Sequence, residues 1–140
     1  MELRITPRVD RKTIINAPPK NVYAIIEDRA NFPKWNIVVK EMTELEEDKW
    51  LVKSTVGDIT SVRIEAVPYE KFTDKQDGPM TKMGYIFKQE GDGTEVTLWG
   101  EFDEPSMEMV LGKAGEIFLE CLKKYAEYLE AGGNPGEYKK

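Results

Sequence analysis

The chain has 140 residues, 40% of them hydrophobic, and a formal net charge of −6 at pH 7. This length and apolar content predict one domain over residues 1–140 and exclude a largely disordered chain. The acidic balance argues against nucleic acid or an anionic membrane surface as a partner, because both bind clusters of lysine and arginine.

The use of cysteine and the lengths of the apolar runs indicate a compartment. Cys121 is the one cysteine, and a lone cysteine cannot form an internal disulfide, which favours a reducing environment. No run of about 18 apolar residues is present, and the N-terminal sequence lacks the apolar core of a secretory leader. We therefore expect a cytoplasmic protein without an integral membrane segment.

The first predicted elements are a strand and two short helical segments. Residues 9–16 are rich in β-branched side chains, which is typical of a strand. The Ala-Pro-Pro sequence that follows ends this strand and starts a helix to about Asp28, since proline fits the first helical turn. Pro33 interrupts the next segment, where Phe32 and Trp35 are expected in a second short helix or a turn.

From Ile37 onward the apolar period changes to two, which predicts six strands. Turn sequences rich in glycine and aspartate separate most of them, and strands joined by tight turns pair antiparallel. The predicted strands are 37–46, 49–56, 59–68, 70–76, 82–90 and 94–102.

Alternation along these strands assigns a face to each side chain. Arg63 and Glu65 are expected to form an exposed pair of little energetic value. Trp99 falls on a mostly polar face, for which two explanations stand: a bulge that reverses the register, or a surface or homodimer contact. The side chains expected to face the interior are Trp50, Val52, Val56, Val62, Ile64, Ala66, Met83, Tyr85, Phe87, Val96, Leu98, Gly100 and Phe102.

A single long helix is predicted from Pro105 to Glu130. A helix of this length buries its apolar stripe only by lying across a large curved sheet, so the whole pattern predicts an α+β fold. Residues 132–140 are expected to form a flexible tail. The stripe consists of residues at steps of three and four: Val110, Leu111, Ala114, Ile117, Phe118, Cys121, Leu122, Tyr125 and Leu129.

Two glycines interrupt this helix, Gly112 and Gly115. Each costs about 1 kcal/mol relative to alanine in a helix interior. Either the helix packs closely on the sheet there, or the glycines leave space beside a pocket entrance. Met107 would lie at that entrance, because methionine adapts to irregular apolar surfaces.

Residues 15–36, INAPPKNVYAIIEDRANFPKWN, resemble the opening of the START-like, or SRPBCC, superfamily. Within this superfamily, the resemblance is strongest to the polyketide cyclase/dehydrase and lipid-transport group. The GDGTEVTLWGEF sequence resembles that superfamily's last hairpin, and the final helix resembles its grip helix. The resemblance implies a helix-grip fold, β-α-α-β6-α, in which a curved antiparallel sheet wraps around the C-terminal helix. The matching elements near the N-terminus are Ala17-Pro18, Val22-Tyr23, Asp28 and Pro33-Lys34-Trp35-Asn36.

The same resemblance implies an internal apolar cavity that binds a lipid, an isoprenoid or a polyketide-like molecule. Sites of this kind have volumes on the order of 300–1,000 Å³. Tyr85 or Trp50 would orient the ligand, although Tyr85 also fits a core tyrosine whose hydroxyl meets backbone or water. The residues expected to line the cavity are Trp35, Trp50, Val52, Val62, Ile64, Tyr85, Phe87, Leu98, Met107, Leu111 and Phe118.

The residue types limit the chemistry that the protein can perform. The chain contains no histidine, which excludes Ser-His and Cys-His nucleophile pairs and any histidine-ligated metal. No catalytic residue or metal site stands out, Asp74 falls near a predicted turn, and no cofactor is expected.

We therefore favour a binding or carrier protein for a small hydrophobic ligand. Two alternatives remain. One is a cyclase, aromatase or dehydratase that works without metal or histidine and uses a tyrosine or carboxylate for proton transfer. The other is a protein-interaction module resembling the chaperone-activator branch of the superfamily, which would present an exposed apolar patch.

Overall fold

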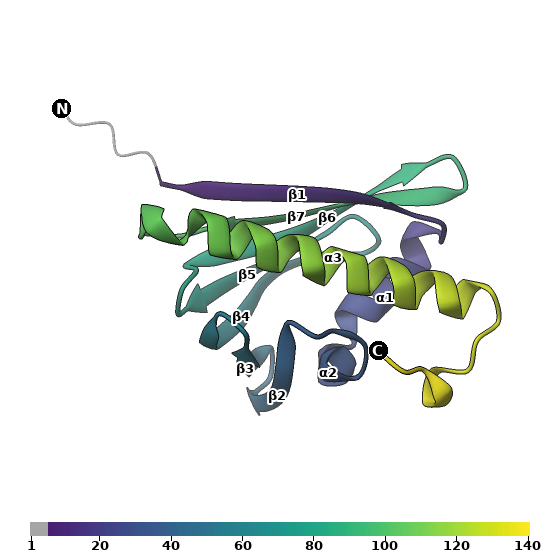
Figure 1. Cartoon of the computed structure of the whole chain (residues 1–140), viewed down its shortest axis with the longest axis horizontal. Coiled ribbons are helices and arrows are strands. Elements are labelled where there is room, and N and C mark those ends of the chain that lie inside the picture. The colour runs from purple at the N-terminus through teal and green to yellow at the C-terminus, as the bar shows by residue number, and fades with distance from the viewer. Residues whose placement is uncertain (1–5) are drawn as a thin grey trace.

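The computed structural model describes residues 6–140, and in this range the chain forms a seven-stranded antiparallel sheet and a 23-residue helix, α3. Residues 1–5 lie outside the described part, and so does part of the N-terminal sequence in which we expected no secretory leader. The predicted α+β helix-grip architecture is confirmed (Figure 1). The elements are β1 Arg8–Ile15, α1 Pro19–Glu27, η1 Arg29–Asn31, α2 Phe32–Trp35, β2 Val39–Glu46, β3 Lys49–Ser54, β4 Gly57–Val67, β5 Lys71–Asp77, β6 Lys82–Glu90, β7 Gly93–Glu101, η2 Pro105–Met107, α3 Glu108–Glu130 and η3 Pro135–Glu137.

The strands follow the order β1-β7-β6-β5-β4-β3-β2 in the sheet. Strands β2 to β7 form consecutive hairpins, as tight turns between alternating segments predict. The N-terminal strand β1 joins at the far edge beside β7, where Arg8 lies opposite Glu101 and Ile15 opposite Thr94. One edge of the sheet is therefore built by the first strand and the other by the second.

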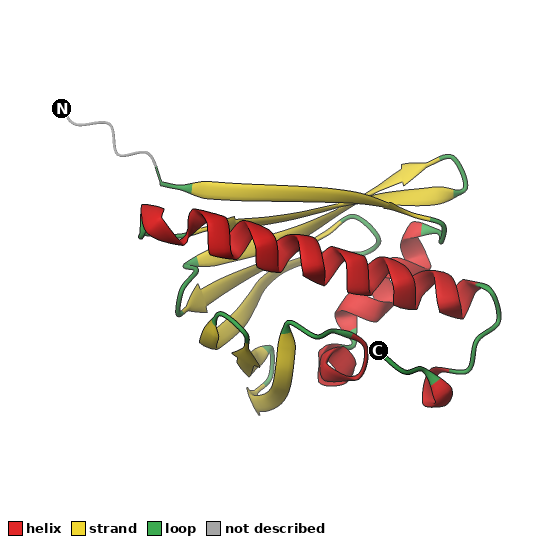
Figure 2. Ribbon diagram, viewed as in Figure 1, coloured by secondary structure: helices red, strands yellow, loops and turns green. Residues whose placement is uncertain are grey.

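Helix α3 crosses the concave face of the sheet and runs beside β1 (Figure 2). Its buried side includes Leu111, Phe118, Leu122 and Tyr125. Val110 was predicted on this apolar stripe but is 49% exposed, because it lies on the flank of the first turn. The α-helix begins at Glu108, three residues later than predicted, since Pro105–Met107 form a 3-10 turn.

Aromatic rings pack against one another at one end of the molecule. Trp35 stacks on Tyr125 with ring centroids 5.8 Å apart and lies edge-on to Phe118. Tyr23 of α1 stacks on Phe72 of β5 at 4.2 Å. This cluster ties α1, α2 and the C-terminal half of α3 to the sheet.

Trp99 lies on the outer face of β7 and covers Gly84 of β6, its direct cross-strand partner. The guanidinium carbon of Arg8 lies 4.6 Å from the centre of the Trp99 ring. Of the two explanations left open for Trp99, the bulge is wrong, because the pairing of β7 with β1 and β6 is continuous through Trp99. A glycine beneath the ring and an arginine above it account for a tryptophan on this face.

The segment after α3 folds back along the helix. The hydroxyl of Tyr128 donates a hydrogen bond of 2.8 Å to the backbone oxygen of Asn134, and the ring of Tyr138 lies 4.8 Å from that of Tyr125. The flexibility expected for residues 132–140 stays a prediction. Over residues 6–140, no helix combines the length and the apolar character that crossing a bilayer requires.

Candidate functional site

A cavity of about 110 Å³ lies between the N-terminal half of α3 and the inner face of the sheet. It is smaller than the 300–1,000 Å³ expected for this class of site, because large side chains extend into the space. Most of its walls are apolar. They are formed by Val9, Phe32, Val38, Val39, Met42, Trp50, Val52, Val56, Ile59, Met80, Met83, Tyr85, Leu98, Leu111, Ala114 and Phe118.

Six of the eleven residues predicted to line a cavity do line it, and five lie elsewhere. Trp35 is 1% exposed and belongs to the aromatic core, as does Phe87, which contacts Tyr23 and Tyr85. Met107 lies in the η2 turn outside the cavity wall. Val62 and Ile64 are also outside it. The six lining residues are Trp50, Val52, Tyr85, Leu98, Leu111 and Phe118.

The inward orientation predicted for Val62 and Ile64 of β4 is wrong, whereas Ala66, beyond an irregularity in the β4–β5 pairing, is paired with the buried Phe72 although it is exposed itself. Ile64 is 54% exposed, and the neighbouring positions Ser61 and Arg63 line the cavity instead. The predicted orientation placed the more apolar face of the strand inside. The β3–β4 hairpin dictates the opposite, since directly paired residues share a face, and Trp50 is paired with Ser61.

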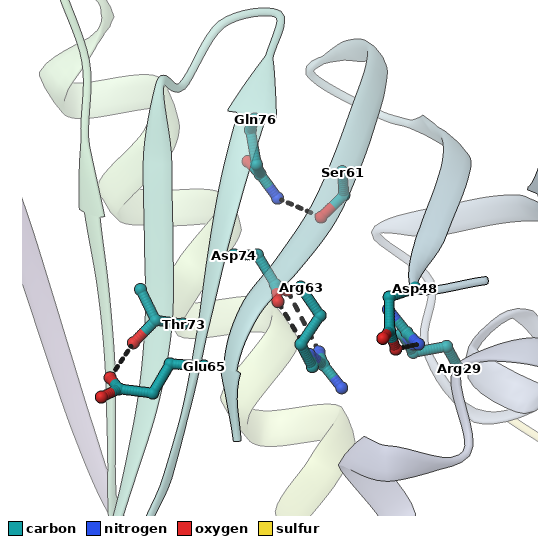
Figure 3. Close-up of polar contacts among 8 residues, drawn as sticks. All are labelled: Arg29, Asp48, Ser61, Arg63, Glu65, Thr73, Asp74 and Gln76. Atoms are coloured by element: carbon teal, nitrogen blue, oxygen red, sulfur yellow. Dashed lines mark hydrogen bonds and ion pairs between the residues drawn. The ribbon is translucent and has the colours of Figure 1, made fainter. Parts of the chain in front are cut away.

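Arg63 and Asp74 form a buried, two-pronged ion pair across β4 and β5. The Nε and Nη2 atoms of Arg63 donate to the two carboxylate oxygens of Asp74 at 2.8 and 3.1 Å (Figure 3). Each side chain is only 6% exposed. The guanidinium carbon also lies 4.0 Å from the centre of the Phe72 ring. Asp74 is thus a buried strand residue rather than a turn residue, and Arg63 is not part of an exposed pair with Glu65.

Glu65 lies on the opposite face of the sheet, separated from Arg63 by an irregularity in the β4–β5 pairing. There it accepts a hydrogen bond of 3.0 Å from the hydroxyl of Thr73 (Figure 3). That bond, followed by the one from Lys71, lowers the pKa of Glu65 below its ordinary value. Glu65 is consequently a surface group with no part in the cavity.

Arg29 extends from η1 toward the same cavity. Its side chain is 13% exposed, and its Nη2 donates to Asp48 at 3.3 Å (Figure 3). Its Nε and Nη1 atoms are buried without a hydrogen-bond partner, as is the Nε1 atom of Trp50. Burial, and then the positive charge of Arg63, lowers the pKa of Arg29. The guanidinium carbon lies 5.4 Å from the centre of the Trp50 ring.

Two further polar side chains border this cluster. Gln76 donates through Nε2 to the Ser61 hydroxyl at 3.4 Å, while its Oε1 is buried without a partner. Tyr85 is 3% exposed, and burial, followed by the charge of Asp74, raises the pKa of its phenol. Its hydroxyl therefore stays protonated at neutral pH, as a donor of a hydrogen bond requires.

The glycines of α3 have different surroundings. Gly112 lies against the guanidinium of Arg11, which reaches across from β1, so close packing accounts for this glycine. Gly115 lines the cavity and has only ordinary contacts with Arg11 and Leu98. Of the two alternatives left open by the sequence, close packing therefore applies to Gly112, and space beside a pocket applies to Gly115.

The cavity residues that the sequence did not predict include Arg29, Arg63, Asp74 and Gln76. A signal for Arg63 was present, because the turn at 55–56 sets Ser54 opposite Gly57 and places every second residue of β4 from Gly57 inward. For Arg29 the one-dimensional pattern carries no such signal. It follows α1 in a short 3-10 turn, and its neighbours come from β2, β3 and β4.

Fold and site together define a helix-grip protein whose long helix closes an apolar cavity with buried cationic groups at one end. Residues 6–127 match the family model described as polyketide cyclase / dehydrase and lipid transport. The chain belongs to this family, which confirms the predicted resemblance. No curated protein matches the sequence significantly.

Solved structures show the same fold at low identity. The Zhui aromatase/cyclase from Streptomyces sp. R1128 is 16% identical with a TM-score of 0.81, over 93% of this chain and 100% of that one. A START superfamily protein from Mycobacterium smegmatis is 13% identical with a TM-score of 0.77, over 87% and 98%. CalU16 from Micromonospora echinospora is 18% identical with a TM-score of 0.70, over 91% and 80%.

Proposed function

We propose that the protein binds a small, largely apolar ligand in the cavity beneath α3 and acts as a binding or carrier protein. The observation that supports this most is a hollow with apolar walls that is bordered by Arg29, Trp50 and Gln76, each of which has a buried polar atom without a partner. Natural interiors seldom leave such atoms unpaired, so unpaired atoms around a cavity point to a ligand.

The volume narrows the kind of ligand. An apolar protein cavity of about 150 Å³ accommodates benzene, and the cavity here measures about 110 Å³. Among the lipid, isoprenoid and polyketide-like ligands expected from the family, this size favours a compact ring over a long chain. Apolar burial would supply the affinity, at about 25 cal/mol per Å² removed from water.

A cavity-filling variant tests the proposal. Ala114 lines the cavity from α3, so Ala114→Leu places three further carbons in it. In an NMR titration with toluene we expect saturable shifts in the wild type and at least a tenfold weaker affinity in Ala114→Leu. Ala66→Leu, at an exposed position of β4 that does not line the cavity, serves as the matched control and should bind like the wild type. An unsaturable or absent response in the wild type would overturn the proposal.

The second candidate is an enzyme of the aromatase, cyclase or dehydratase type. The specific observation in its favour is Tyr85, a tyrosine that lines the cavity together with the charged pair Arg63–Asp74. Tyr85 would then donate its proton to a carbonyl oxygen as a ring closes. A poly-β-ketone thioester should cyclise faster with the wild type than in buffer, and no faster with Tyr85→Phe than in buffer. Equal rates with both proteins would remove this candidate.

A further inference from the structure

The geometry points to a carboxylate on the ligand, bound at the end of the cavity where Arg29 meets Trp50. This inference rests on the proposed function and extends it by naming the charge and chemical class of the ligand: a small carboxylic acid with a ring-sized apolar body.

Three donor nitrogens of residues at this end of the cavity have no hydrogen-bond partner. Two belong to Arg29, Nε and Nη1, and the third is Nε1 of Trp50. The Trp50 residue is only 9% exposed, and both side chains line the cavity. A buried donor without an acceptor costs free energy, and a ligand oxygen that accepts from these groups would remove the cost.

The acidic side chains nearby do not accept hydrogen bonds from these unpaired nitrogens. Both carboxylate oxygens of Asp74 accept from Arg63. Asp48 engages only Nη2 of Arg29, at 3.3 Å, and its own side chain is 57% exposed. The buried part of the site therefore holds two guanidinium groups, Arg29 and Arg63, against the single carboxylate of Asp74.

This surplus of positive charge selects an anion over a neutral acceptor. In a region shielded from water, a guanidinium gains more from a carboxylate than from an amide or an alcohol. A carboxylate offers two oxygens to the three donors, whereas the small volume and the apolar walls disfavour a bulkier, doubly charged phosphate. The ring of the ligand would then point toward Leu98, Leu111 and Phe118.

Benzoate and benzamide form a matched pair of probes, since they share size and shape and differ in charge. By isothermal titration calorimetry we expect the wild type to bind benzoate at least tenfold more tightly than benzamide. Arg29→Gln should reduce this preference to less than threefold, chiefly through loss of benzoate affinity. Arg8→Gln, which removes an arginine from the outer face over Trp99, is the matched control and should keep the full preference.

Equal affinity of the wild type for both probes would overturn the inference, as would an equal loss of both in Arg29→Gln. Either result leaves the proposed function standing if toluene still binds, whereas failure of all three probes contradicts the proposed function itself. If Arg29→Gln does not fold, Trp50→Phe removes one donor and keeps a ring. Benzoate should then bind at least threefold more weakly, and an unchanged benzoate affinity would count against the inference.

Discussion

Tyr85 lies between the apolar wall of the cavity and the carboxylate of Asp74, and both surroundings oppose ionisation of its phenol. Burial and then Asp74 raise its pKa above the ordinary value of 10.0. The folded chain therefore holds this proton more tightly than the unfolded chain does. The resulting stabilisation is complete below about pH 10 and is lost as the pH rises further, because the unfolded state then releases the proton first.

This linkage predicts a difference between the wild type and Tyr85→Phe in alkali. Between about pH 9 and 11, the free energy of unfolding should fall more steeply in the wild type, since only the wild type unfolds to release the Tyr85 proton. Urea denaturation at several pH values measures the two slopes. Tyr69→Phe, at a 49% exposed tyrosine, is the control and should keep the wild-type slope. Parallel slopes for wild type and Tyr85→Phe would contradict the prediction.

At the scale of elements, β4 and β5 are joined by the buried pair Arg63–Asp74 as well as by the sheet hydrogen bonds. A buried ion pair contributes little net stability compared with a well-packed apolar pair, whereas the loss of one partner leaves the other charge buried and unpaired. The intact pair should therefore add little net stability, although each partner depends on the other.

A double-mutant cycle tests this view of the pair. Arg63→Met and Asp74→Leu should each destabilise the fold by about 3–5 kcal/mol, whereas the double variant should lose far less than the sum. Urea unfolding of the four proteins provides the coupling energy. Additive losses would show that each side chain is held by contacts other than its partner.

Alanine substitutions at two closely packed glycines, Gly84 and Gly112, should have opposite effects on the stability of the protein. A Cβ on Gly84 would lie 2.5 Å from the Trp99 ring, which Arg8 holds in place, so Gly84→Ala should destabilise the protein by about 1–3 kcal/mol. A Cβ on Gly112 would meet the guanidinium at the far end of the long Arg11 side chain and lie 3.4 Å from Val9, and alanine favours the helix by about 1 kcal/mol. Gly112→Ala should therefore leave the stability unchanged or raise it by up to about 1 kcal/mol. Thermal unfolding compares the two variants, and a larger loss in Gly112→Ala would reverse the argument.

Elements with a strong local period were predictable from the sequence, and the interior of the site was only partly so. The α3 stripe and the hairpin of β6 and β7 follow from periods of 3.6 and 2, which a single segment displays on its own. The prediction of which face of β4 is interior was wrong. The interior side carries Ser61 and Arg63, whose partners Gln76 and Asp74 lie on another strand. The cavity volume depends on how side chains from many segments fill the space, and no local pattern encodes that.

At the scale of the whole molecule, the aromatic core and the cavity lie toward different ends. Around Trp35, Tyr125 and Phe72 the rings pack against one another and supply a core that is independent of any ligand. Beneath the N-terminal half of α3, the cavity replaces such contacts with space and with unpaired donors. Stability and binding are therefore located in different parts of one sheet, so changes in the cavity should alter binding without abolishing folding.

Ligand-induced stabilisation tests this division. A ligand that binds only the folded state at 100 times its dissociation constant adds about 2.7 kcal/mol, which corresponds to roughly 5–10 °C in the unfolding temperature of a domain of this size. Toluene should therefore raise the unfolding temperature of the wild type in a concentration-dependent manner. In Ala114→Leu the shift should vanish, while the unfolding temperature without ligand should be equal to that of the wild type or higher, because the added side chain occupies space that is empty of protein atoms. A variant that unfolds well below the wild type would show that the region beneath α3 is already fully packed, and that the hollow is not available to a ligand.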